Sequence, residues 1–359
     1  MTYFAHRGLT RFVLSGRTGG DITEVVKEHF GSTAGTSITV LYFFAIFPIL
    51  LIYSVALTNT VSSFIEHQLH LQPPPRAMLS FVLILGLLAI VRCGEQATVK
   101  VMSLLVYPFI VALALLGLYL VPHWTGGILD SATQVPPASA FLHTLWLAIP
   151  VMVFSFNHSP IISAFAVDQK RRYGDHADER SGQILRRAHL LMVVMVLFFV
   201  FSCVLTLSSA QLAEAKAQNL SILSYLANHF SNPTIAFAAP LIAFVAIAKS
   251  FLGHYIGASE GLKGIIAKTG ARPGAKALDR VVAGLMLVVC WVVATLNPSI
   301  LGMIESLGGP ILAVLLFLMP MYAIRRVPSM RKYSGAASNV FVVVVGLVAL
   351  TSVVYGLLG

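Results

Sequence analysis

The sequence predicts an all-α polytopic membrane protein whose chain crosses the bilayer nine times. Hydrophobic residues make up 57% of its 359 residues and charged residues only 11%, too few to cover the surface of a soluble globule of this size. The apolar residues also gather in long runs, several with the roughly 20 residues that a helix needs to cross ~30 Å of hydrocarbon. The alternation of membrane strands is absent, and lipid cannot bond exposed backbone groups, so these runs are expected to be helices.

The expected spans follow the apolar runs along one transmembrane domain that covers residues 1–359. They lie near residues 37–60, 77–93, 99–121, 142–167, 187–207, 235–258, 281–297, 306–324 and 338–358.

Residues 1–36 are expected to form a cytoplasmic segment ahead of the first span. Within it, "DITEVVKEHFG" should form a short helix. Asp21 is its expected N-cap, Glu24 stands where a capping box needs it, and Gly31 can end the helix.

The net charge of +10 would on its own suggest a nucleic-acid partner, but the positions of the basic residues argue against one. If residues 1–36 are cytoplasmic, every Lys and Arg except Arg76, Lys216 and Lys249 falls in loops on the cytoplasmic side. This is the positive-inside pattern of membrane proteins. It predicts the lipid bilayer as the partner, a cytoplasmic first loop and a C-terminus outside.

The stretch "SFNHSP" at residues 155–160 is the main candidate for a binding site. Pro160 has no N–H to donate, so the helix is expected to break here. The two half-helix ends would then offer N–H groups to a carboxylate and carbonyl groups to a cation, the two charges of an amino acid. Ser155, Asn157, His158 and Ser159 are expected to face this substrate. The alternative is a proline kink whose polar side chains only bond neighbouring helices.

Lys249 is the one basic residue expected inside a span. It either extends toward the cytoplasmic surface or holds a charge that couples transport to protons, alone or paired with Glu260 or Glu305. His254 lies about one helical turn further along and is a second candidate for proton coupling. Tyr53 in the first span is a candidate substrate contact, although tyrosines also gather at membrane interfaces.

Glycine and proline residues mark two further positions. Gly253 and Gly257 are spaced so that another helix can approach closely. Gly308, Gly309 and Pro310 stand at the entry of a span, where they either let backbone approach a ligand or simply cap and turn the chain.

The sequence gives little support to an enzyme. H-E-x-x-H, G-x-S-x-G and a carboxylate pair within a span are all missing. No catalytic residue, metal site or cofactor is therefore expected. His158, His189 and His254 fall on three different spans, from which no metal geometry can be inferred.

Several segments resemble the hydroxy and aromatic amino acid permease family, in particular its serine-transporting branch. They are "FAHRGLTRFVLSG", "LYFFAIFPILLIYSVALTNT", "SFNHSPIISAFAV", "AIAKSFLGHY", "VVATLNPSILGMIESLGGPI" and "LMPMYAIRRVPSMRKYSG", and the resemblance runs along essentially the whole chain. It implies a bacterial inner-membrane protein with the eleven-helix, inverted-repeat, leucine-transporter-like fold of the amino acid–polyamine–organocation superfamily. It also implies proton-coupled uptake of L-serine. A permease for threonine or an aromatic amino acid is the alternative within the family.

The chain departs from the family pattern at its start, where two helices of the family have no counterpart. The nine expected spans are then a remnant of the eleven-helix fold. "SFNHSP" would be the break of the sixth helix, and the broken first helix that pairs with it would be missing. We expect the true start to lie upstream of Met1. The alternative is a truncated fragment that is inactive in transport.

Overall fold

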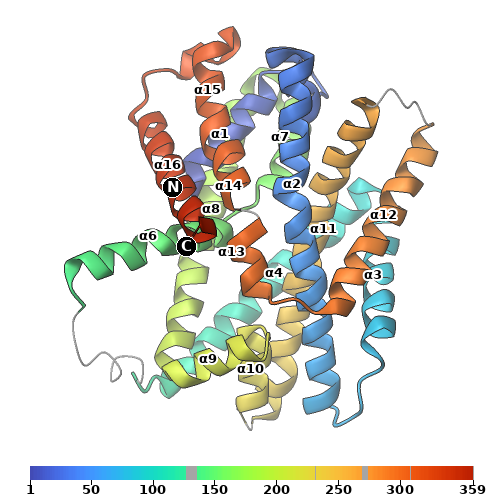
Figure 1. Ribbon diagram of the computed structural model, residues 1–359, viewed down its shortest axis with the longest axis vertical. Helices are drawn as coiled ribbons and strands as arrows, with labels where there is room; N and C mark the ends of the chain where they lie inside the picture. The colour runs from blue at the N-terminus through green and yellow to red at the C-terminus, as the bar shows by residue number, and fades with distance from the viewer. Residues whose placement is uncertain (127–135, 231, 269–273, 308, 359) are drawn as a thin grey trace.

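The computed structural model describes residues 1–126, 136–230, 232–268, 274–307 and 309–358, and all regular structure within these ranges is helical (Figure 1). Seven helical stretches in the described residues are long and apolar enough to cross a membrane. They run Ile22–His67, Ala97–His123, Ala138–Ser155, Ser159–Thr206, Pro233–Lys268, Ala275–Leu296 and Ala337–Tyr355. The all-helical, polytopic prediction is confirmed, whereas nine crossings and an inverted repeat stay predictions.

The centre of the molecule is the pair α2 (Ile22–His67) and α11 (Pro233–Lys268), which lie against each other along much of their length (Figure 1). A side chain at Gly261 of α11 would meet the Cα atom of Phe43 at 3.1 Å, so the two backbones approach closely there. Leu50 and Phe251 are fully buried in the core between these helices. This pair therefore forms the scaffold against which the other helices pack.

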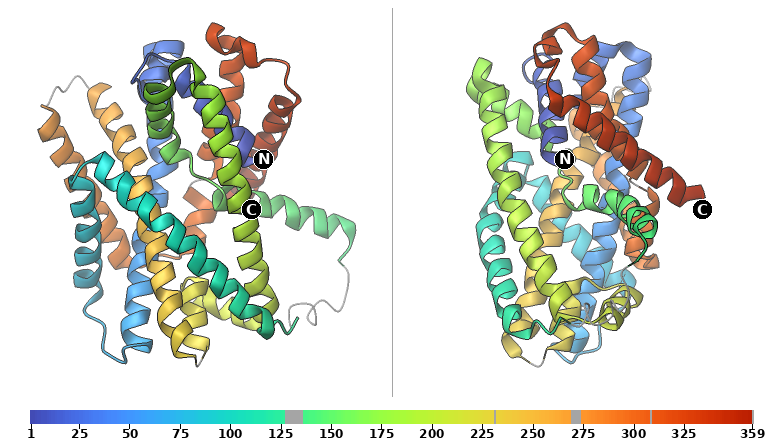
Figure 2. Two further views of the ribbon diagram at one scale, coloured as in Figure 1. Left: turned by 180° about the vertical axis from the view of Figure 1, so that it is seen from behind. Right: turned by 90° about the vertical axis from the view of Figure 1, so that its left-hand side faces the viewer.

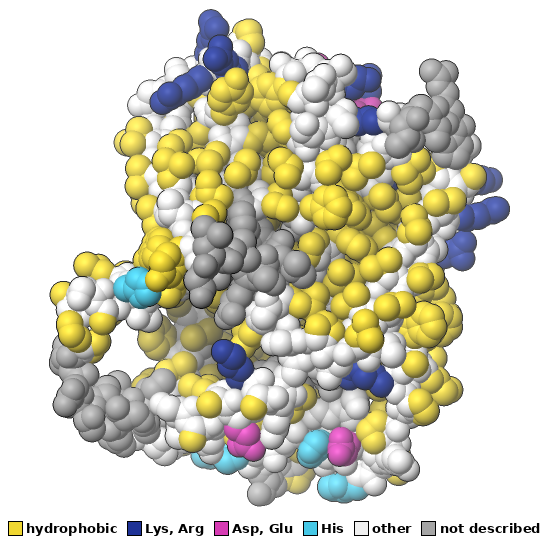
Figure 3. All heavy atoms as spheres, in the orientation of Figure 1, with side chains coloured by type: hydrophobic (Ala, Val, Ile, Leu, Met, Phe, Trp, Pro, Cys, Tyr) yellow, Lys and Arg dark blue, Asp and Glu magenta, His cyan; other side chains and the backbone are white. Residues whose placement is uncertain are grey.

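Other helices cover the pair from both sides. On one side lie α3 (Arg76–Arg92) and α12 (Ala275–Leu296). On the other, α4 (Glu95–Leu120) packs against α11, and α8 (Ala177–Thr206) packs against α4. Short helices close the lower end in Figure 1, namely η1 (Val121–His123), α9 (Ser209–Ala217) and α10 (Ile222–His229). The hydrophobic side chains cover the middle of the face shown in Figure 3, as expected of a surface that meets lipid.

Two expected spans are not single regular helices. The span near 142–167 is divided into α6 (Ala138–Ser155) and α7 (Ser159–Tyr173), which continues through η2 (Gly174–His176) into α8. Figure 2 shows α6 projecting sideways from the bundle.

The second is the span near 306–324. It consists of α13 (Ile300–Leu307), α14 (Gly309–Leu312), the π-helical turn η3 (Ala313–Leu318) and α15 (Met319–Arg326). Pro320 in the first turn of α15 lacks the N–H that a continuous α-helix would use. The chain then passes through η4 (Pro328–Tyr333) into α16 (Ala337–Leu358).

The first 36 residues include a helix that packs into the bundle. Helix α1 (Thr2–Leu14) packs into the core against α7, α8 and α15, and its Ala5, Leu9 and Phe12 are at most 3% exposed. This burial was not expected, because the segment was interpreted as a cytoplasmic extension. The apolar face of α1 fits a surface that only the folded bundle creates.

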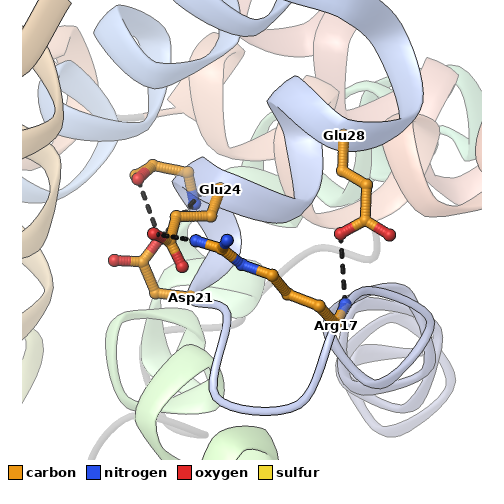
Figure 4. Close-up of polar contacts among 5 residues, drawn as sticks. Arg17, Asp21, Glu24 and Glu28 are labelled. Atoms are coloured by element: carbon orange, nitrogen blue, oxygen red, sulfur yellow. Dashed lines mark hydrogen bonds and ion pairs between the residues drawn. The ribbon is translucent and has the colours of Figure 1, made fainter.

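The cap of α2 differs in part from the prediction. The Asp21 carboxylate accepts hydrogen bonds from the backbone N–H groups of Thr23 and Glu24 at 2.9 and 3.0 Å, as expected of an N-cap. The predicted capping box is wrong, because the Glu24 carboxylate instead pairs with the Arg17 guanidinium at 2.6 Å (Figure 4). Gly31, at φ +81°, interrupts the helical backbone as expected.

Candidate functional site

The candidate site is built around the interruption between α6 and α7. Helix α6 ends at Ser155 and α7 begins at Ser159, with non-helical backbone at Phe156 (φ −109°, ψ 12°) and His158 (φ −135°, ψ 26°). Pro160 stands in the first turn of α7, where its missing N–H costs no helical hydrogen bond. The chain is therefore interrupted within the stretch where the sequence placed a break.

The N–H groups at the start of α7 already have partners. The Ser159 N–H donates to Asn157 Oδ1 at 3.1 Å, and the His158 N–H donates to Nε2 of His6 at 3.2 Å. The Ile161 N–H bonds the His158 carbonyl at 3.2 Å. The expectation that these groups are free is thus wrong for this conformation, because local side chains replace the lost helical acceptors.

The four polar side chains expected to face a substrate point to different partners. Ser155 Oγ donates to the Val151 carbonyl of its own helix at 2.8 Å and is exposed, whereas Ser159 is buried. Asn157 Nδ2 is buried and has no hydrogen-bond partner among the described residues. The Asn157 side chain lies beside the His6 ring, and Nδ2 is its one donor without a regular hydrogen bond among the described residues.

Helix α11 meets the interruption backbone to backbone. A Cβ atom at Gly257 would lie 2.8 Å from the Pro160 carbonyl oxygen and 3.0 Å from its Cα atom, so only glycine fits without a shift. Three residues earlier, which is about 4.5 Å along a helix, His254 packs edge-to-face on the Tyr53 ring, with centroids 5.0 Å apart. The structure therefore brings Tyr53 and His254 onto the level next to the interruption.

Lys249 lies apart from this group. Its Nζ atom is 5.0 Å from the centroid of the Phe109 ring on α4, a cation–π contact, and no carboxylate in the described part of the chain forms an ion pair with it. Glu260 is not its partner, because that carboxylate accepts hydrogen bonds from Ser163 Oγ at 2.6 Å and from the Ile22 N–H at 3.2 Å. The side chain of Glu305 lies outside the described residues.

The glycine–proline turn at residues 308–310 can be placed only in part. Gly308 lies outside the described residues, and Gly309 and Pro310 form the start of α14. Their suggested role beside a ligand stays a prediction.

The structure also shows a cluster that the sequence did not reveal. The imidazole rings of His6 on α1, His158 at the interruption and His189 on α8 lie together, and one ring nitrogen from each falls within 4.8 Å of the others. His6 and His158 are stacked, with centroids 3.8 Å apart and an angle of 4° between the rings. His6 lies in the segment that the sequence predicts to be cytoplasmic, so nothing in the sequence placed it beside two membrane histidines.

A cavity of about 260 Å³ with mostly polar lining residues opens at the end of α2. This end of the helix is at the bottom of Figure 1. Its lining residues are Asn59, Ser62, Ser63, Glu66, His67, Arg76, Gln218, Leu220 and Asn297. Asn59, in its lining, lies about 9 Å further along α2 than Tyr53.

At the opposite end of the molecule, polar contacts join α1 to α7 and α8. Arg11 pairs with Asp178 at 2.9 Å, and its guanidinium stacks 3.9 Å above the Tyr333 ring. Burial and the nearby Asp178 carboxylate raise the pKa of Tyr333 to about 12. Lys170 on α7 donates to the Leu14 carbonyl at 2.8 Å and to the Gly16 carbonyl.

Several known bacterial proteins are similar in sequence to this chain. The serine transporter SdaC of Escherichia coli strain K12 is 62% identical over 99% of this chain and 85% of its own length. SdaC of Escherichia coli O157:H7 is equally similar, and SdaC of Shigella flexneri is 61% identical over the same shares.

The match extends to a whole family. Residues 11–357 match the tryptophan/tyrosine permease family, which is the resemblance that the sequence motifs suggested. Its members are permeases, which supports the prediction that the chain is not an enzyme. Because this match covers nearly the whole chain, and its apolar helices agree with it, the chain belongs to the tryptophan/tyrosine permease family.

Proposed function

We propose that this chain takes up L-serine, or a similar small hydroxy amino acid, together with a proton across the bacterial inner membrane. The observation that carries the proposal is the interruption between α6 and α7, packed against Gly257. Non-helical backbone at membrane depth is tolerated where it is buried in protein or lines a site. The identity of 62% to serine transporters supports serine as the substrate.

An amino acid suits the two ends of the interruption. The carboxylate would take the N–H groups of His158 and Ser159, displacing His6 Nε2 and Asn157 Oδ1. The carbonyl groups at the end of α6 would face the ammonium group. Asn157 Nδ2 and the hydroxyl group of Tyr53 are the proposed partners of the remaining polar atoms of the substrate.

Coupling and topology complete the proposal. Lys249 and His254 lie on the helix that meets the interruption, where a change of charge would act on the site, and we assign proton coupling to them. The distribution of Lys and Arg supports nine crossings with the first loop cytoplasmic and the C-terminus outside, and the family resemblance supports an inverted-repeat fold. In Figure 3 basic side chains lie at the upper end and along the right-hand edge of the face shown, and two smaller groups lie in its lower half.

Uptake of labelled L-serine into cells that lack their own serine carriers tests the function. We expect accumulation that a protonophore abolishes and that excess unlabelled serine competes away. Stronger competition by threonine would move the substrate assignment to threonine, and stronger competition by tryptophan or tyrosine would move it to an aromatic amino acid. Uptake no greater than in empty cells, with the protein present in the membrane, would leave the transport-inactive alternative.

A further inference from the structure

We propose that His6, His158 and His189 form the site that binds the transported proton. The inference rests on the proposed proton-coupled uptake. It assigns the binding of the proton to these three rings, and Lys249 and His254 then take part in the coupling without holding the transported proton. The three rings come from α1, the interruption and α8, so one protonation event can act on three elements of the bundle.

The hydrogen bonds determine which ring nitrogens carry hydrogen. Nδ1 of His6 lies 2.7 Å from the Thr2 carbonyl oxygen, which can only accept, so this nitrogen is protonated. Nε2 of His6 accepts the His158 N–H and is therefore unprotonated. Nδ1 of His189 likewise donates to the Leu185 carbonyl at 2.8 Å, which leaves a lone pair on its Nε2.

Nε2 of His189 is the available basic atom. It is buried and has no hydrogen-bond partner among the described residues, while His189 as a whole is 5% exposed. A proton on this atom would face the ring of His158, whose centroid is 4.6 Å from that of His189. Two positive rings at these distances would repel each other strongly in a buried setting, so the cluster has room for one proton.

The surrounding charges do not compensate for a proton. On the side of α1, His189 lies near the Tyr3 ring and the amino group of Met1. The guanidinium group of Arg7, also on α1, packs against Gly182 of α8. Across the described part of α1, α7 and α8, no carboxylate forms an ion pair with any of the three rings. A protonated cluster is consequently costly unless an anion arrives from elsewhere.

The carboxylate of the substrate is that anion. Its proposed donors include the His158 N–H, which now bonds Nε2 of His6. Transfer of the proton to His6 removes this acceptor, frees the His158 N–H and places a positive charge beside the carboxylate. Proton and substrate therefore each increase the affinity for the other, and by linkage the two increases are equal.

A metal ion fits the same rings less well. Three histidines suit zinc when their lone pairs converge on one point about 2.0–2.1 Å from each nitrogen. Here the rings of His6 and His158 are parallel, so their in-plane lone pairs run alongside one another, and Nε2 of His6 is already occupied.

Proton uptake on serine binding is the decisive measurement. Purified protein in weakly buffered detergent solution, with a pH indicator, should take up at most one proton for each serine bound. The affinity for serine should rise by about 5- to 150-fold from high to low pH, the usual range for two coupled ligands. In His189→Gln and His6→Gln we expect no proton uptake and an affinity that no longer depends on pH. His143→Gln, an exposed histidine on α6, should behave as the unmodified protein.

The outcomes separate the two proposals. If the unmodified protein binds serine without taking up protons, proton-coupled uptake itself fails. If it takes up protons and both histidine variants do so equally, only the cluster is wrong. Loss of proton uptake on serine binding in Lys249→Ala, but not in the two histidine variants, would place the proton at Lys249. A stoichiometric transition metal in the purified protein, absent from His189→Gln, would replace the proton site by a metal site.

One measurement does not depend on whether the variants fold. In unmodified protein labelled with ¹⁵N-histidine, serine should convert one imidazole from the neutral to the protonated form in the nitrogen NMR spectrum. A spectrum in which serine binds and every imidazole keeps its charge would overturn the inference.

Discussion

Replacing Gly257 by alanine should disturb the candidate site more than any other single methyl group on α11. The added Cβ atom would lie 2.8 Å from the Pro160 carbonyl oxygen and 3.0 Å from the Pro160 Cα and Cβ atoms. Optimal contacts between such atoms are about 3.5–4.0 Å, so α11 and α7 must separate by roughly 0.5–1 Å. Two of the atoms met are backbone atoms, which cannot rotate away as a side chain can.

The cost follows from overpacking. Forcing an extra carbon into a packed core destabilises a protein by about 1–3 kcal/mol. Because the displaced residue stands in the first turn of α7, the strain falls on the N–H groups of His158 and Ser159. If it acts on the binding conformation, affinity for serine should fall by roughly 5- to 150-fold, since about 1.4 kcal/mol corresponds to a factor of ten.

The same helix offers a matched control. A Cβ atom at Gly253, one turn earlier, would meet only the terminal methyl group of Met102 at 3.1 Å, the far end of a flexible side chain. Gly253→Ala should therefore retain affinity and gain up to about 1 kcal/mol from helix propensity. The assay is serine binding to purified protein, with the apparent Tm at a fixed scan rate as a check on folding. Equal affinities and equal Tm values for the two variants would refute the close contact between α11 and α7.

Four further perturbations have distinct expected results. Lys249→Ala should abolish gradient-driven serine accumulation in vesicles but leave serine exchange intact if this residue takes part in coupling, and normal pH-dependent accumulation would remove it from the mechanism. Asn157→Asp should keep the Oδ1 cap of α7 yet weaken serine binding as much as Asn157→Ala, by roughly 2- to 12-fold, because a missing Nδ2 donor costs about 0.5–1.5 kcal/mol. Affinity close to normal in Asn157→Asp alone would assign the residue to capping. In a cysteine-free background, an impermeant thiol reagent should label His70→Cys in intact cells and Ser334→Cys only after permeabilisation, and the reverse pattern would invert the topology. The pKa of the Tyr333 phenol is raised to about 12 from an ordinary value of about 10, so its neutral form contributes stability that is complete below pH 10 and lost as the pH rises to about 12. Tyr333→Phe should therefore lessen the fall in Tm over that pH range, and an unchanged fall would contradict this assignment.

Local features of the fold were predictable from the sequence, because short stretches of chain determine them. The long apolar runs require helices in lipid, and Asp21 caps α2 because its carboxylate needs only the next two N–H groups. The interruption before Pro160 belongs to this class as well, since a proline and a run of polar residues are enough to disfavour a continuous helix.

Features that depend on which helices meet were not predictable. Glu260 was a reasonable partner for Lys249 on one helix, but α2 and α7 bring Ser163 and the Ile22 N–H to it instead. His6 joins two other histidines only because α1 enters the bundle, and that depends on a surface assembled from α7, α8 and α15. Such contacts arise from packing between distant segments, which periodicity within one segment does not encode.

The hydrogen bonds that the N–H groups at the start of α7 already make have a consequence for release of the substrate. Asn157 and His6 already accept the hydrogen bonds that an incoming carboxylate would take, so binding exchanges one set of acceptors for another. An exchange of this kind contributes little net free energy, in keeping with the ~0.5–1.5 kcal/mol of a typical intramolecular hydrogen bond. When the substrate departs, the internal acceptors return to the backbone N–H groups of His158 and Ser159, so neither of these two groups is left unsatisfied. A carrier has to empty its site once in every cycle, and internal substitutes for the ligand make the empty state nearly as favourable as the loaded one.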